Sequence, residues 1–122
     1  IGGTKVQQGK LTDLATDAVS VEVSGIAFTH IAKIGGRPLQ GDRVRWFGSP
    51  GGVTDLFRTG YIVRSWTDEL MLDAQIFGGD SGAGLFDDEG RLIAVVTAAR
   101  AMNTVSENNL YRIQFAVAVP IR

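Results

Sequence analysis

Residues 79–86 read Gly-Asp-Ser-Gly-Ala-Gly-Leu-Phe and place a serine, Ser81, among glycines at an expected turn between two strands. Small neighbours let an acyl group approach the hydroxyl, and they leave the backbone N–H groups of Gly79 and Ser81 free to face a developing oxyanion. A nucleophilic serine requires both an accessible hydroxyl and such N–H donors. An α/β-hydrolase nucleophile elbow would require a helix after the serine. Here residues 87–90 (DDEG) lead into the apolar run 92–96 (LIAVV), so a hairpin is expected instead.

Hydrophobic and polar residues alternate with a period of two along most of the chain. Val19, Val21 and Val23 are separated by Ser20 and Glu22, which is the pattern of a half-buried strand. Further strands are expected over 43–47, 57–66, 69–76, 91–97 and 110–119, between turns rich in Gly and Asp. Residues 98–109 could form a loop or a short helix, and residues 1–12 look loosely specified. Sixteen glycines with several short strands predict an all-β, antiparallel Greek-key barrel.

Length and charge narrow the function classes. A chain of 122 residues fits one domain, taken here as 1–122. With 12 Lys+Arg against 13 Asp+Glu and no basic run, nucleic acid is not an expected partner. No apolar stretch is long enough to suggest a membrane span. One histidine, no cysteine and scattered acidic residues predict neither a metal nor another cofactor, and the lack of cysteine leaves the cellular compartment open.

The serine-containing segment resembles the Gly-Asp-Ser-Gly-Gly-Pro active-site loop of the trypsin-like (chymotrypsin-fold) serine proteases, from which it departs at Ala83 and Gly84. Other landmarks follow in the family's order. Residues 16–23 (TDAVSVEV) are similar to the strand that carries the catalytic aspartate in HtrA-type members. The remaining matches to that group are 39–44 (LQGDRV), 47–52 (FGSPGG), 59–63 (TGYIV), 87–96 and 115–120 (FAVAVP). The resemblance covers the second barrel of such a protease and the strand leading into it.

This resemblance implies roles for named residues. Ser81 is expected to be the nucleophile and Asp17 the residue that orients a histidine, although Asp13 competes with Asp17. The expected oxyanion hole consists of the backbone N–H groups of Gly79 and Ser81, with Asp80 as a possible third. The side chain of Asp80 is expected to accept hydrogen bonds from the backbone of its own loop.

The resemblance also suggests where a polypeptide substrate would bind. Gln75 lies six residues before Ser81, at the position that forms the base of the primary specificity pocket in trypsin-like enzymes. One wall of that pocket is expected to consist of Thr97, Ala98 and Ala99. Because Gln75 is uncharged, we expect a small or uncharged side chain before the cleaved bond.

A general base is missing from the expected site. A serine hydroxyl needs such a base within hydrogen-bond reach, and none of the 16 residues before Asp17 is histidine. His30 lies 13 residues after Asp17 and is expected to be structural. Either the chain is the carboxy-terminal part of a protease whose first barrel supplies the histidine, or it is a non-catalytic protease-like barrel that acts as a binding or structural module. Apolar Phe115 and Val117 on the last strand are consistent with packing against a first barrel.

Overall fold

The computed structural model describes residues 4–15, 17–74 and 78–122. In these ranges the chain is built from β-strands and a 3₁₀ turn at Pro50–Gly52, and none of it forms a helix long and apolar enough to cross a membrane. The strands are β1 Gln7–Ala15, β2 Ala18–Ser24, β3 Arg43–Gly48, β4 Leu56–Ser65, β5 Leu70–Leu72, β6 Gly84–Phe86, β7 Leu92–Ser106 and β8 Asn109–Pro120.

Strands β3 to β8 form a closed barrel in the order β3-β4-β5-β8-β7-β6, and every pairing is antiparallel. Arg45 of β3 pairs with Phe86 of β6 and closes the barrel. Strand β6 therefore returns to lie beside β3, after β3, β4 and β5 have followed one another around the wall. This is Greek-key connectivity, so the expected fold class is confirmed.

The core fills the inside of the barrel with the inward-facing residues of all six strands. Trp46 of β3 is its largest member and is 1% exposed. The other buried members are Val44, Ile62, Leu70, Leu72, Leu85, Ile93, Ala94, Val96, Ala116 and Ala118. Alternation in β3 has the predicted period, because Val44, Trp46 and Gly48 are buried while Arg43 and Phe47 are exposed.

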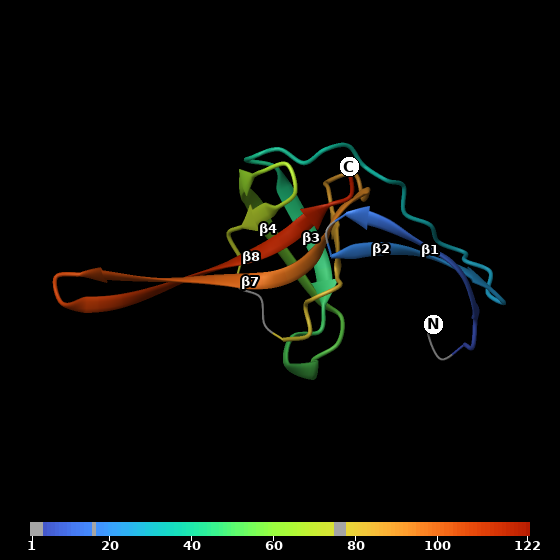
Figure 1. The fold of residues 1–122 in the computed structure, drawn as a ribbon, viewed down its shortest axis with the longest axis horizontal. Helices are drawn as coiled ribbons and strands as arrows, with labels where there is room; N and C mark the ends of the chain where they lie inside the picture. The colour runs from blue at the N-terminus through green and yellow to red at the C-terminus, as the bar shows by residue number, and fades with distance from the viewer. Residues whose placement is uncertain (1–3, 16, 75–77) are drawn as a thin grey trace.

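Residues 98–109 are neither a loop nor a helix. They belong to a long hairpin in which β7 and β8 stay paired from the barrel wall to Ser106 and Asn109, and the hairpin projects far from the barrel (Figure 1). Its turn residues Glu107 and Asn108 both have positive φ, at 49° and 67°, which fits the tight turn whose twist matches paired strands. The strands extend because continued pairing satisfies their backbone groups.

Two further expectations need correction. Residues 7–12 of the supposedly loose lead-in belong to β1, which pairs with β2 in a separate two-stranded sheet. Backbone pairing orders this segment although most of its side chains are polar and exposed. Of the expected strand 69–76, residues 75 and 76 lie outside the described residues, and β5 covers only 70–72 of the remainder. The chain leaves the barrel wall at Asp73, whose carboxylate accepts the N–H of Tyr61 at 2.7 Å.

Candidate active site

Ser81 lies in the connection between β5 and β6, where the chain turns back towards β7. The N–H of Ala83 donates to the carbonyl of Asp80 at 3.1 Å and closes a turn around Ser81 and Gly82. Gly82 then donates to Val96 of β7 at 2.7 Å, and Val96 donates back to Ala83 at 2.9 Å. These bonds join the turn to a central strand of the barrel. The serine is therefore presented on a short loop with a rigid base.

The Ser81 side chain is exposed, and its hydroxyl donates to the backbone carbonyl of Thr97 at 3.1 Å. Thr97 sits at a β-bulge, since the register between β7 and β8 shifts between Val96 and Ala98. Bulges often redirect a strand beside a site. A carbonyl can hold the hydroxyl but cannot remove its proton, so this contact positions Ser81 without activating it.

The amides that flank Asp80 are available for a ligand. In the part of the chain that the structure describes, the N–H groups of Gly79 and Ser81 donate to no residue. The carbonyls of the same loop are occupied, because Gly78 accepts from Gly51 at 2.9 Å and Gly79 accepts from Ser49 at 3.3 Å. The loop is thus fixed through its oxygens and retains donors, which is what binding of an oxyanion requires.

Glycine is required at position 79. Its φ is +108°, and a Cβ there would lie 2.0 Å from the carbonyl oxygen of Ser49. Gly48, at the end of β3, is similarly constrained: a Cβ would lie 2.0 Å from Oδ1 of Asp80. The loop therefore packs directly against the backbone of β3 and the 3₁₀ turn after it, and the two glycines make that approach possible.

The Asp80 side chain is fully buried and forms an ion pair with a residue from another strand. Its Oδ2 accepts a hydrogen bond from Nη1 of Arg58 in β4 at 2.6 Å. The carbon of the Arg58 guanidinium lies 5.3 Å from the ring centroid of Trp46. The expectation of purely local backbone bonding for this carboxylate thus missed Arg58, which lies 22 residues away along the chain.

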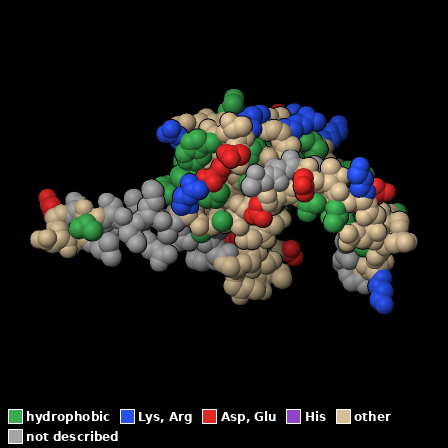
Figure 2. Space-filling view, in the orientation of Figure 1, with side chains coloured by type: hydrophobic (Ala, Val, Ile, Leu, Met, Phe, Trp, Pro, Cys, Tyr) green, Lys and Arg blue, Asp and Glu red, His purple; other side chains and the backbone are tan. Residues whose placement is uncertain are grey.

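Asp17 occupies the β1–β2 turn with a φ of +64°, and it lines the same cleft as Thr97, Ala98 and Ala99. The other residues of that cleft are Asp68, Glu69, Arg100, Val117 and Val119. Figure 2 shows the molecule hollowed between the barrel and the β1–β2 arm. Asp13 lies within β1, opposite Val19, and does not line this cleft. Of the two aspartates considered, the structure brings Asp17 towards the residues beside Ser81.

The one histidine is not joined to this site by any described contact. His30 lies exposed between β2 and β3, and its Nδ1 is 3.0 Å from Oγ1 of the adjacent Thr29. Gln75, the expected base of a specificity pocket, lies outside the described residues.

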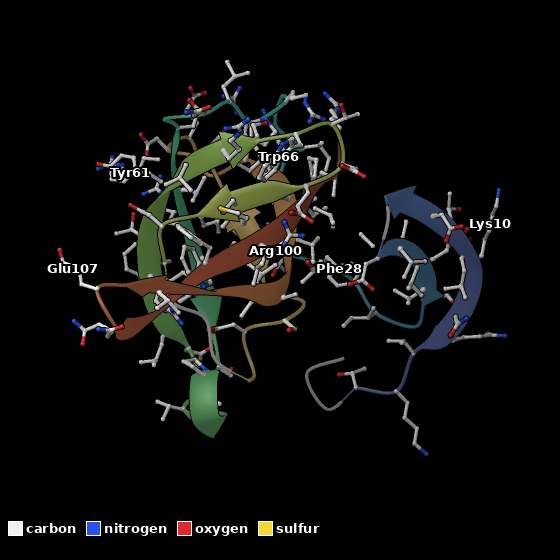
Figure 3. All side chains as sticks on the ribbon, turned by 60° about the vertical axis from the view of Figure 1, so that its left-hand side comes forward. Lys10, Phe28, Tyr61, Trp66, Arg100 and Glu107 are labelled. Carbon is white, nitrogen blue, oxygen red and sulfur yellow. The ribbon has the colours of Figure 1, made fainter. Side chains whose placement is uncertain are left out.

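One further ion pair borders the cleft and was not anticipated from the sequence. Arg100 of β7 binds Glu69 through both terminal guanidinium nitrogens, Nη1 at 2.8 Å and Nη2 at 2.9 Å. Figure 3 shows Arg100 at the barrel end of the long hairpin and Glu107 at its far tip. The pair joins β7 to the turn before β5. Residues 98–109 were expected to form a loop or a short helix, so the sequence pattern did not place Arg100 on a strand, and it gives no signal for its partner, 31 residues earlier.

The acidic cluster Asp87-Asp88-Glu89 forms the tip of the β6–β7 hairpin. Burial alone would raise the pKa of Asp87, but hydrogen bonds from the N–H groups of Arg91 and Glu89, together with the Arg91 guanidinium, lower it below its usual value. These carboxylates stabilise a turn. Across residues 4–15, 17–74 and 78–122, no three His, Asp or Glu side chains cluster as metal ligands would.

The comparison with protein families gives one result that agrees with this geometry. Residues 3–95, which include β1 to β6 and the first four residues of β7, match the model of the trypsin-like peptidase domain. A comparison with curated proteins gives no match. The match covers more than half of the chain and includes the loop around Ser81. The chain belongs to the family of trypsin-like peptidase domains.

Proposed function

We propose that this chain is the part of a serine endopeptidase that is acylated on Ser81, and that the general base is a histidine from outside the segment. One observation carries the proposal. Ser81 is exposed at a rigid turn, beside two amides that donate to no described residue, within a peptidase-type domain. This combination provides a nucleophile and an oxyanion hole.

The proposed reaction follows from these groups. The Ser81 oxygen attacks the carbonyl carbon of the scissile bond while the base takes the hydroxyl proton. The carbonyl oxygen becomes an oxyanion and accepts hydrogen bonds from the amides of Gly79 and Ser81, with the amide of Asp80 as a further candidate. The protonated base gives its proton to the leaving amine as the C–N bond breaks. Water then attacks the acyl-Ser81 ester, loses a proton to the base, and releases the carboxylic acid and free serine.

The surroundings of Ser81 support an external base. Its hydroxyl donates to the Thr97 carbonyl, and the ring nitrogen of His30 contacts Thr29. Asp17, which lines the cleft that Thr97 borders, would accept the Nδ1–H of an incoming histidine and fix its orientation. The proposed role of Asp17 therefore depends on the external histidine.

The β1–β2 hairpin supports the presence of a further barrel or segment that carries this histidine. Leu11, Val19 and Val21 are 54%, 51% and 46% exposed. Leu11 pairs with Val21, and Val19 is two residues from Val21, so all three lie on one face of the hairpin. A two-stranded sheet of this kind is marginal by itself and gains stability when its apolar face is covered.

A polypeptide substrate would align along β7. In the described strands β6 pairs with Leu92–Val95, so the edge of β7 beyond Thr97 can accept an extended peptide as an added strand. Thr97, Ala98 and Ala99 line the cleft there and offer little steric obstruction. Because Gln75, six residues before Ser81 in the sequence, is uncharged, we propose a small or uncharged side chain before the cleaved bond.

The test compares the 122-residue chain with the longest natural form of the protein, using casein hydrolysis and a fluorophosphonate probe. We expect the natural form to be labelled on Ser81, and Ser81→Ala to lower turnover by about 10⁶-fold. Ser49→Ala is the matched control, because Ser49 lies in the adjacent turn but is not the proposed nucleophile. Labelling of Ser49 or Ser65 would refute the assignment.

A non-catalytic binding or structural module is the alternative, and the bond from Ser81 to the Thr97 carbonyl is the observation that favours it. In that case the longest natural form neither hydrolyses casein nor reacts with the probe. A probe reaction confined to the natural form supports the external base.

A further inference from the structure

The outer wall of the barrel carries an apolar groove that shares no lining residue with the cleft at Asp17 and Thr97. The groove has a volume of about 400 Å³ and lies across β3, β4 and β6. Its lining consists of Arg45, Trp46, Phe47, Phe57, Phe86 and Gly90. Phe47 and Phe57 are 59% and 56% exposed, so two large rings face water side by side. Such a patch marks a binding surface more often than a single exposed ring does.

The three phenylalanines surround one arginine on the same face of the sheet. Phe47 and Phe57 are direct partners in the β3–β4 register, and their ring centroids lie 5.4 Å apart at an interplanar angle of 58°. Phe86 of β6 pairs with Arg45 on the other side of β3. Direct cross-strand partners share a face, as do residues two apart on one strand. All four side chains therefore lie on the outer face of the barrel wall.

Arg45 is half-buried in the groove, and backbone carbonyls hold its guanidinium. Its Nε donates to the carbonyl of Asp87 at 3.3 Å, and its Nη2 donates to the carbonyl of Asp88. In the described part of the chain Arg45 forms no ion pair, since the side chains of these two aspartates bind Arg91 and Arg43. Its Nη1 donates to none of the described residues. The guanidinium is thus held in place while it keeps an unmatched charge and free donors.

A ligand for this groove needs a carboxylate and an apolar group close together. Arginine binds carboxylates through charge-assisted hydrogen bonds, which are stronger than neutral ones. Residues two apart on a strand are separated by roughly 7 Å, so Arg45 and Phe47 reach one small ligand. The last residue of a polypeptide carries its side chain and its terminal carboxylate on the same carbon atom, which suits this separation. A long acyl chain would need an apolar channel, whereas the lining offers three rings around one cation.

We propose that the groove on β3, β4 and β6 binds the carboxyl terminus of a polypeptide whose last residue is aromatic or branched and apolar. Arg45 binds the terminal carboxylate, and Phe47, Phe57 and Phe86 cover the last side chain. The arginines at 43, 45 and 91 balance the three carboxylates at 87–89, so the partner is recognised by contact and not attracted from a distance. The site needs no peptidase chemistry and is independent of the proposed function.

The first test varies the ligand, so it does not depend on the folding of a variant. The longest natural form of the protein, carrying Ser81→Ala to prevent hydrolysis, is titrated calorimetrically with the free acid of acetyl-Ala-Ala-Phe. We expect the carboxyamide of this peptide to bind at least about tenfold more weakly, because it lacks the charge. The free acid of acetyl-Ala-Ala-Gly, which lacks the ring, should lose a similar factor. Equal affinity for the acid and the amide, or no binding of the acid, would overturn the inference. Octanoate that binds as tightly as the peptide would overturn the choice of a polypeptide terminus.

The second test varies the groove. Arg45→Gln and Phe57→Ala should each weaken binding of the free acid by at least about tenfold. Arg43→Gln is the matched control, because Arg43 does not line the groove and its ion pair with Asp88 has members that are each 54% exposed. It should change the affinity by less than about twofold. Unchanged affinity in both groove variants would refute the proposed site.

The place of binding is measured by amide NMR without any substitution in the groove. On addition of the free acid we expect the largest shifts at Phe47, Phe57 and Gly90, in the same Ser81→Ala protein. Shifts confined to 97–99 would show that the peptide occupies the proposed substrate cleft instead, and the inference would fail. A natural form without peptidase activity would remove the proposed function and leave this result unaffected.

Discussion

Substitution of Gly79 by alanine should damage both the fold and the proposed site, and its neighbours provide matched controls. The new Cβ would lie 2.0 Å from the Ser49 carbonyl oxygen, whereas contacts under 3.0 Å are essentially never seen, so the two groups must separate by about 1 Å. The φ of +108° adds strain of about 1–3 kcal/mol for a residue with a side chain. Separation also weakens the Ser49-to-Gly79 hydrogen bond, worth about 1 kcal/mol. We therefore expect a loss of about 2–4 kcal/mol in the free energy of unfolding.

Substitutions of Gly78 and Gly82 separate the effect of the close approach to Ser49 from the effect of the positive φ. A Cβ at Gly78 meets nothing within 4 Å and no positive φ applies, so Gly78→Ala should change stability by less than about 0.5 kcal/mol. Gly82 has the same open space but a φ of +89°, so Gly82→Ala should show the strain alone. Urea unfolding measures all three, and fluorophosphonate labelling reports the site, where a 1 Å displacement should cost about 10²-fold. If Gly79→Ala is as stable as Gly78→Ala, the close approach described here is wrong.

Two more substitutions test other parts of the chain. The pKa of Asp87 is lowered on folding, so its carboxylate stabilises the fold above its usual pKa of about 4, and this contribution is lost as the pH falls through the lower folded value. Asp87→Asn should thus cost about 1 kcal/mol in urea unfolding at pH 7 and progressively less as the pH falls below about 4; a loss that does not change with pH would show that the charge of Asp87 does not contribute. His30→Ala should leave casein hydrolysis by the longest natural form unchanged, and abolished activity would make His30 the base.

The barrel strands were predictable because their side chains alternate between core and solvent. The pattern over 43–47 and 57–66 closely matches β3 and β4. It fails where the described side chains are exposed, as at residues 7–13 and 98–100. Strand β1 is mostly polar, and residues 98–109 lack any period, so their strands follow from backbone pairing with a neighbour. The Glu107-Asn108 turn was the available signal, since asparagine tolerates positive φ.

Only those features of the candidate site that depend on residues close together in the sequence were predictable. The glycines around Ser81 mark a turn that exposes a hydroxyl, and the structure has that turn. The partner of Asp80 was not predictable, because Arg58 is one of several arginines on strands and the pairing depends on how β4 and the loop meet in space. The same holds for Glu69 and Arg100. Long-range ion pairs leave no periodic trace in a sequence.

The Greek-key order has a consequence for how such a domain can change. The connection that carries Ser81 must span from β5 to β6 across one end of the barrel, so its length is tied to the barrel's width. A much shorter connection could not make that span. The β7–β8 hairpin has no such tether, because its tip, at Glu107 and Asn108, lies far from the barrel wall (Figure 1). Residues added or removed at that tip change how far the hairpin extends but do not affect closure of the barrel. The length of the hairpin is therefore free to vary.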